Sequence, residues 1–317
     1  MNFWYSAVRD NGRLREPEAS LDARELRPLS TGEILDRTFT LYRRNFLLFL
    51  GISAIPHVLV LVLNLLRVSL TFSGSSLSRV TMHPGGAVTT TPPGMPSLNG
   101  IMAGAVIGLL VVVVSLIAYL LSQGGTVFAV SEIYLGRTIT IAESFRRVSG
   151  ELLNLLGVVM LNGLATLAGF ICLFVPGVYI LCRLIVCVPA ALVENIGARD
   201  SLERSYELTR DNAGRAFVIL LLYFSVAFAA AGLFAWPFLI IMAVVAQKDP
   251  SQMIFWLQLT QVGSFVANVL VTPILTIASA ILYYDLRVRK EAFDIQLMMN
   301  PTGSTAPLTN SLPTMFS

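Results

Sequence analysis

The chain has few charged residues. They make up 13% of its 317 positions, whereas about 25% is usual in soluble proteins, and hydrophobic residues make up 55%. A soluble globular protein is therefore excluded, and we expect an integral membrane protein. The formal net charge of +3 gives no argument for nucleic acid as a partner, because that binding requires basic residues clustered on one face.

Residues for catalysis are also scarce. The two histidines, His57 in an apolar run and His83 in a polar segment, are far apart in sequence and do not have metal-ligand spacing. The chain contains no phosphate-binding loop, dinucleotide fingerprint, GxSxG elbow or HExxH motif. We therefore expect no enzyme activity, no bound metal and no cofactor.

Cysteines are few and lie close together in sequence. Cys172, Cys182 and Cys187 all belong to one apolar region. An odd number in such a setting argues against a disulfide framework and predicts buried, reduced thiols. The N-terminal segment lacks the basic stretch and apolar core of a cleaved signal, so we expect the first span to start membrane insertion.

Long apolar runs, by contrast, are abundant. A helix needs about 20 residues to cross the bilayer core, and six runs approach or exceed that length. Gly124-Gly125 predicts the break that ends the second run, and Pro176-Gly177 predicts the turn between the third and fourth. The predicted spans are 46–67, 101–123, 152–174, 178–194, 215–237 and 262–284.

The polar segments complete the predicted organisation. Residues 1–28 and 297–317 predict disordered tails on either side of a membrane domain that covers 29–296. Residues 69–100 are rich in Ser, Thr, Pro and Gly, which predicts a long exposed loop.

Basic residues give the predicted orientation. All but four of the 22 Lys and Arg residues lie before spans one, three and five or after span six. The positive-inside rule then places both termini in the cytoplasm, with the chain in a bacterial inner membrane. The four exceptions are Arg67, Arg79, Arg183 and Lys248.

Three basic segments resemble one another and predict amphipathic helices at the membrane surface. The first begins with Ser30-Thr31-Gly32-Glu33, which is typical of a capping box. The predicted fold is an all-α integral membrane protein with six transmembrane helices as three hairpins, each preceded by an amphipathic interfacial helix. The alternative to true repetition is that any basic amphipathic helix before a span looks alike. The shared frame is Leu35-x-Arg37, Phe145-x-Arg147 and Leu202-x-Arg204.

Three stretches of the chain also carry a family resemblance. They are LSTGEILDRTFTLYRRNF near the start, PGVYILCRLIVCVPAALVEN with SLERSYELTRDNAGRAF in the middle, and ILYYDLRVRKEAFD near the end. These stretches resemble a bacterial family labelled the glycerophosphoryl diester phosphodiesterase membrane domain. The resemblance covers about residues 27–296 and implies the membrane part alone, without the soluble phosphodiesterase found in some members. It implies no catalytic chemistry.

Arg183 is a charged residue inside a predicted span, six residues after Gly177. In one interpretation it is structural and either reaches the outer headgroups, about 9 Å along the helix, or contacts a neighbouring helix. In the other it contacts a substrate or a lipid phosphate. Five amide residues are interpreted as hydrogen-bonding partners between helices rather than as a site: Asn154, Asn162, Asn268, Gln258 and Gln261.

The basic helices predict a scaffold or docking component that acts at the cytoplasmic leaflet. Its candidate contacts to lipid or partner are Arg37, Arg147, Arg204 and Arg183, and its expected partners are the bilayer, anionic lipid headgroups and a protein on the cytoplasmic face. The alternative is a transporter or lipid-handling protein with a midplane cavity near Arg183, surrounded by proline-broken spans. A third hypothesis, an accessory of a membrane-bound phosphodiester hydrolase, requires a histidine and carboxylate cluster that the sequence lacks.

Overall fold

The computed structural model describes residues 29–72, 80–82, 88–90, 98–248 and 252–299. Nearly all of these residues are helical, and two short strands pair antiparallel with Val80 opposite Thr90 and Met82 opposite Val88. The helices are α2 (Thr31–Arg44), α3 (Phe46–Phe72), α4 (Leu98–Tyr134), α5 (Ile141–Cys172), α6 (Phe174–Arg183), α7 (Cys187–Glu194), α8 (Ala198–Leu208), α9 (Ala213–Phe234), α10 (Trp236–Lys248) and α11 (Met253–Met299), and the strands are β1 (Val80–Met82) and β2 (Val88–Thr90).

Within the described residues, six helical segments are long and apolar enough to cross a membrane, when α6 and α7 are counted together. The prediction of six apolar helices is therefore confirmed, although their boundaries differ. α5 includes the predicted interfacial segment and the third span in one continuous helix, and α11 extends beyond the predicted span 262–284 at both ends. The predicted tail 1–28 and residues 300–317 lie outside the described residues, as does much of the predicted loop 69–100.

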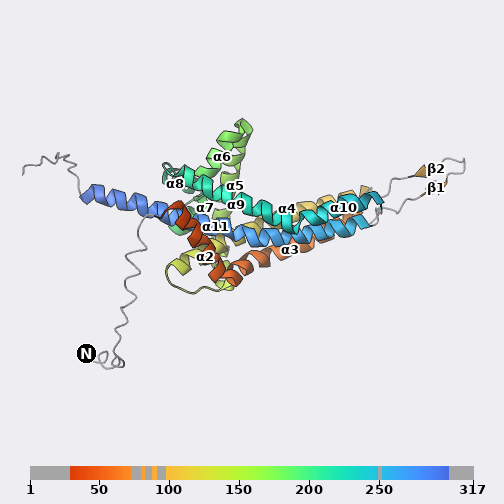
Figure 1. Cartoon of the computed structure of the whole chain (residues 1–317), viewed down its shortest axis with the longest axis horizontal. Helices are drawn as coiled ribbons and strands as arrows, with labels where there is room; N and C mark the ends of the chain where they lie inside the picture. Colours follow the sequence, from red (N-terminus) through yellow and green to blue (C-terminus); the bar gives the residue numbers. More distant parts are fainter. Residues whose placement is uncertain (1–28, 73–79, 83–87, 91–97, 249–251, 300–317) are drawn as a thin grey trace, which may run out of the picture.

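Helix α11 packs against most of the other helices. Figure 1 shows α3, α4, α10 and α11 side by side along the long axis, whereas α5 and α6 lean away from it. α11 contacts α3, α4, α9 and α10, and near its C-terminal half it also contacts α2, α7 and α8. We call the end of the bundle that holds α2 and α8 the α2 end, and the opposite end, where α3 leads toward β1, the β1 end.

The main core lies at the α2 end. Between Ile277 and Leu286, nearly every residue of α11 is buried, including Tyr283 at 0% exposure. A helix that is covered on all sides needs neighbours all round, and here these include Ile34 of α2 and Phe49 of α3. This packing fixes α2 against the bundle and so determines where its basic face points.

The predicted break at Gly124-Gly125 is wrong, because α4 runs through both residues without interruption. Both glycines are buried where α4 meets α3 and α5. A Cβ atom on Gly124 would lie 2.9 Å from Val148 Cγ1, and one on Gly125 would lie 2.9 Å from Ile52 Cγ2. The glycine pair therefore permits close helix packing and does not end the span.

The predicted turn at Pro176-Gly177 is also misplaced. The chain leaves α5 through Leu173, which has extended φ and ψ values of −171° and 159°, and α6 begins at Phe174. Pro176 lies in the first turn of α6, where a missing N–H costs no helical hydrogen bond. Gly177 instead lets α6 approach α5, since a Cβ atom built on it would lie 2.5 Å from the ring of Phe170.

The long apolar run that contains the predicted span 215–237 is divided at Ala235, between α9 and α10. At this point α11 crosses the junction, and buried Gly263 faces the carbonyl of Phe234. A Cβ atom at position 263 would overlap that carbonyl oxygen, and backbone cannot move aside as a flexible side chain can.

We expect Gly263→Ala to lower the free energy of unfolding by at least about 2 kcal/mol, because overpacking forces backbone shifts. The matched control is Gly150→Ala in α5, where nothing lies within 4 Å of a built Cβ. There the substitution removes a helical glycine and should stabilise slightly. Thermal midpoints of the two purified variants in nanodiscs measure the difference, and equal midpoints contradict this packing of α11.

Candidate functional site

Helix α2 is fixed at its first residues. Ser30 accepts a hydrogen bond from the Glu33 N–H at 3.3 Å, and the Glu33 carboxylate accepts one from the Ser30 N–H at 2.7 Å. The predicted capping box is therefore confirmed. The preceding Leu29 donates its N–H to Asp285 Oδ1 at 2.6 Å and accepts at its carbonyl from Arg289 at 2.6 Å, so the start of α2 is tied to α11.

One face of α2 is buried and the other is basic. Ile34 and Thr38 are 0% and 1% exposed, and Tyr42 donates its hydroxyl to the carbonyl of Leu270 at 3.0 Å. Burial raises the pKa of the Tyr42 phenol, so the hydroxyl stays protonated as the donor. Because these contacts fix the rotation of α2, Arg37 and Arg44 lie away from the core.

Three carboxylates at the α2 end each bind at least one arginine that comes from another segment. We call Glu132, Glu194 and Asp285 the three acidic anchors, and their side chains are 10%, 17% and 1% exposed. They stand at or near the ends of α4 and α7 and in the last third of α11. Their partners are Arg147 at 2.6 Å from Glu132, Arg204 at 3.0 Å from Glu194, and Arg215 and Arg289 at 3.0 Å and 2.8 Å from Asp285.

The three arginines of the predicted frame therefore differ in their contacts. Arg147 binds Glu132 and also Glu143, and Arg204 binds Glu194 and also Glu291. Both guanidinium groups are thus engaged by protein carboxylates. Arg37, in the equivalent position of α2, has no acidic partner in the part of the chain that the structure describes.

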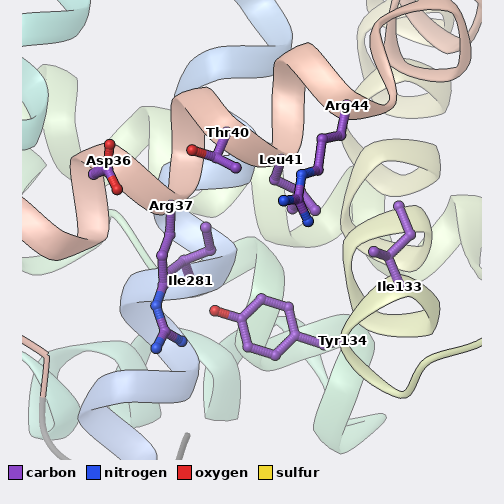
Figure 2. Close-up of a pocket in the computed structure, with 8 residues that line it drawn as sticks. All are labelled: Asp36, Arg37, Thr40, Leu41, Arg44, Ile133, Tyr134 and Ile281. Carbon is purple, nitrogen blue, oxygen red and sulfur yellow. The ribbon is translucent and has the colours of Figure 1, made fainter. Parts of the chain in front are cut away.

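Arg37 instead lines a cleft of about 350 Å³ between α2, α4 and α11, which we call the α2 cleft. In Figure 2 the side chains of Arg37 and Arg44 extend from α2 toward the side of α4 that carries Tyr134. Thr40 lies between the two arginines on the same helix, and Asp36 stands at one edge. The cleft is lined by Asp36, Arg37, Thr40, Leu41, Arg44, Ile133, Tyr134 and Ile281.

The α2 cleft has the chemistry of an anion site. Arg37 and Arg44 are seven residues apart, so they project from one side of α2 about 10 Å from each other. Arg44 also has no acidic partner among the described residues, which leaves two guanidinium groups against the single carboxylate of Asp36. Arginine binds phosphate through paired N–H groups, and the Thr40 hydroxyl adds a further donor.

Arg183 does not lie where the snorkelling interpretation placed it. Its side chain is 1% exposed, so contact with outer headgroups is ruled out in this fold. The guanidinium carbon lies 3.7 Å from the ring centre of Tyr206, and Ser205 and Thr209 donate their hydroxyls to the Arg183 carbonyl at 2.9 Å. Arg183 therefore joins α8 to the interruption between α6 and α7, which is the predicted interhelical contact.

Two nitrogen atoms of Arg183, Nε and Nη1, are buried without a hydrogen-bond partner among the described residues. Arg183 does not line the α2 cleft. It also does not line two further cavities, one at His57 and one at Asn162. Within the described ranges, no group of three His, Cys, Asp or Glu side chains comes close enough to hold a metal ion.

The frame shared by the three basic segments does not include the acidic anchors. A signal does exist, since Glu132, Glu194 and Asp285 each come near the end of a long apolar run, in AVSEIY, ALVENI and LYYDLR. An acid at the end of a span, followed by a basic segment, is a pattern that predicts a pair at the membrane boundary.

Comparisons with known proteins place the chain in no group. No family model, no curated protein and no solved structure matches it. The resemblance to the glycerophosphoryl diester phosphodiesterase membrane domain therefore stays a prediction from the quoted stretches.

Among the three acidic anchors, we expect substitution of Asp285 to lower the free energy of unfolding most. We expect Asp285→Asn to lower the free energy of unfolding by about 3 kcal/mol, because it removes the charge that Arg215 and Arg289 share inside the fold. Asp211→Asn is the matched control, since Asp211 is exposed and has no ion-pair partner among the described residues. Chemical denaturation of both proteins in detergent micelles gives the comparison. A midpoint for Asp285→Asn that matches the control shows that the anchor does not stabilise the α2 end.

Proposed function

We propose that the protein is a non-catalytic membrane scaffold that binds the phosphate of anionic lipid headgroups in the α2 cleft. It thereby presents a docking face at the cytoplasmic leaflet. One observation carries the proposal: Arg37 and Arg44 share a cleft and have no acidic partner among the described residues, whereas Arg147 and Arg204 are paired.

The expected affinity is modest and depends on charge. A basic residue near an anionic membrane surface contributes about 1 kcal/mol, and a charge-assisted hydrogen bond about 1.5–3 kcal/mol. Two arginines on one ligand thus favour an anionic lipid over a zwitterionic one by one to two orders of magnitude, on the order of 2 kcal/mol. Arg147 and Arg204 contribute by holding α5 and α8 in place, not by direct lipid contact.

The finer architecture belongs to the same proposal. α2, the first turns of α5, and α8 are the three interfacial helices, and each precedes a pair of spans in a bacterial inner membrane with both termini in the cytoplasm. The ion pairs of the acidic anchors support this arrangement, because Glu132 and Glu194 each bind the arginine of the interfacial helix that follows. The exposed arginines of these segments then face water or lipid phosphate.

A protein partner is part of the scaffold proposal. α8 lies at the same end of the bundle as α2 (Figure 1), and its exposed charged residues include Arg199 and Glu203. That surface is polar, and a partner of complementary charge suits it better than an apolar one. The accessory role for a phosphodiester hydrolase gains no histidine and carboxylate cluster from the described part of the chain.

Transport is the second candidate function, and one observation favours it. The interruption between α6 and α7 lies directly after Arg183, and two nitrogens of that side chain have no partner among the described residues. Interrupted spans with an internal charge are common at transporter sites. This function requires water to reach Arg183. If the Arg183 guanidinium stays unreactive toward phenylglyoxal in the folded protein, transport through this site is excluded.

The lipid site is tested with Arg37→Gln/Arg44→Gln. In nanodiscs that contain phosphatidylcholine and phosphatidylglycerol, native mass spectrometry counts the phosphatidylglycerol retained by the protein. We expect the double variant to bind it at least about 10-fold more weakly, because both guanidinium contacts to the phosphate are lost.

The matched control is Arg43→Gln, which removes a charge from the same helix at an exposed position outside the cleft. Its retention of phosphatidylglycerol should change by less than about 3-fold, as expected for a single surface charge. If the fold-loss for the double variant is no larger than the square of the fold-loss for Arg43→Gln, binding follows net charge and the α2 cleft is not a site.

The orientation is tested with reporter fusions. We expect a phosphatase inserted near residue 85 to be active, since that enzyme works only outside the cytoplasm, and a fluorescent protein fused after Ser317 to fluoresce. The positive-inside distribution of Lys and Arg is the physical reason. An inactive phosphatase in a stable fusion would show that the orientation is the reverse of the proposed one, which contradicts a docking face in the cytoplasm.

A further inference from the structure

A polar cavity of about 180 Å³ lies between α3 and α11, two helices that are both candidate membrane spans. We call it the α3–α11 cavity. Five of its lining residues are polar, and no Asp, Glu, Lys or Arg takes part. The residues are His57, Val60, Leu61, Asn64, Gln261, Ser264, Phe265 and Asn268.

The polar residues form two facing stripes. His57 and Asn64 are seven residues apart on α3, and Gln261 and Asn268 are seven apart on α11, so each pair lies on one side of its helix. The helices run in opposite directions, and Gln258 of α11 donates to Ser69 of α3 at 2.8 Å nearer the β1 end. Asn64 therefore stands level with Gln261, and His57 level with Asn268.

The cavity lies at membrane depth. His57 is eleven residues from Phe46, where α3 begins, or about 16 Å along the helix, and the bilayer core is about 30 Å thick. Polar side chains at that depth face a bundle interior or a water-filled space and commonly mark a substrate path. The stripe continues from the middle of α3 toward the β1 end.

Three of these side chains hydrogen-bond to their own helix. His57 Nδ1, Asn64 Nδ2 and Asn268 Nδ2 lie 2.8, 3.0 and 2.8 Å from the carbonyl four residues earlier. A carbonyl only accepts, so His57 Nδ1 carries a proton, and in the neutral ring Nε2 is an acceptor. That nitrogen and both amide oxygens have no partner among the described residues.

This bonding pattern corrects part of the interhelical interpretation. Gln258 and Asn154 do bond to another segment, to Ser69 and to the carbonyl of Ile196. Gln261 and Asn268 make no such bond across the α3–α11 interface within the described residues, although both line the cavity and Asn268 is exposed. Side chains that face one another across a space without bonding leave their free acceptors and donors for a ligand.

The chemistry and size of the cavity define the ligand. The free acceptors are His57 Nε2 and the Asn64 and Asn268 oxygens, while Ser264 and Gln261 supply donors. Hydroxyl groups both donate and accept, so they match this mixed lining. No lining charge is present to balance an ion, and about 180 Å³ equals the volume of roughly six water molecules.

We propose that the α3–α11 cavity binds a small, uncharged solute with several hydroxyl groups, of about three to five carbon atoms. The ring of His57 and the two asparagine oxygens accept from its hydroxyls, and Gln261 and Ser264 donate to them. None of the eight lining residues belongs to the α2 cleft, so this proposal does not depend on lipid binding in that cleft.

The test uses the small number of histidines. The chain has two, His57 and His83, so the full-length protein labelled with ¹⁵N-histidine in nanodiscs gives two sets of imidazole signals. The probe is meso-erythritol, with lactate as a charged molecule of similar size. We expect erythritol to shift the His57 Nε2 signal in a saturable way and lactate to cause no saturable shift.

The variant pair is Asn64→Leu/Asn268→Leu against Asn162→Leu, an amide on α5 that also lies in a candidate span. The double variant should bind erythritol at least about 10-fold more weakly, because two acceptors are lost, and the control should bind it as the parent does. Gln261→Leu provides the same comparison should the double variant not fold. An absent or non-saturable shift, equal shifts in all variants, or an equal response to lactate overturns the proposal and leaves a cavity filled by water alone.

Discussion

A single buried carboxylate joins the two ends of the described chain. The Asp285 side chain is 1% exposed, and a charge so placed is stable only when donors surround it. Its donors are the N–H of Leu29, just before α2, Arg215 in α9, and Arg289 one turn further along α11. Removing the carboxylate would leave both guanidinium groups without this partner, and breaking such a buried network costs more than each pair contributes. α2, α9 and α11 are therefore held in one relative arrangement, and the rotation of α2 follows from it.

The same constraint explains why one arginine pair is available to a ligand. Glu132 and Glu194 engage Arg147 and Arg204, so the acids of the α2 end are largely occupied by nearby basic residues. α2 is tied down through its backbone and its buried face, and its own arginines are not needed for that purpose. Arg37 and Arg44 thus keep their hydrogen-bonding capacity. A positive potential concentrated in a cleft attracts an anionic group more strongly than the same charges spread over an open surface.

Much of the fold follows from the sequence, because hydropathy and helix caps are local signals. The six apolar helices and the Ser30–Glu33 capping box are predicted from adjacent residues alone. The errors occur where one residue type has two uses. A glycine pair such as Gly124-Gly125 either breaks a helix or lets helices approach, and only the partner helices decide. Burial of Arg183 beneath Tyr206 likewise depends on α8, a separate helix that comes later in the chain. The α2 cleft could not be predicted from the sequence, because it depends on which arginines are paired in the folded chain.

The hydrogen bonds within α3 and α11 show how polar side chains exist at membrane depth without collapsing the space between them. Each asparagine donates to its own helix backbone, which offsets part of the cost of removing an amide from water and fixes the side-chain direction. Where an amide bonds across the interface instead, as Gln258 does with Ser69, the helices are drawn together. The α3–α11 cavity lies next to that contact, toward the middle of α3, so the cross-helix bond borders it while the self-bonded residues line it. Packing alone would favour leucine at all these positions, since apolar side chains fill such a gap at lower cost. Polar residues at these positions are therefore better explained by a ligand than by stability.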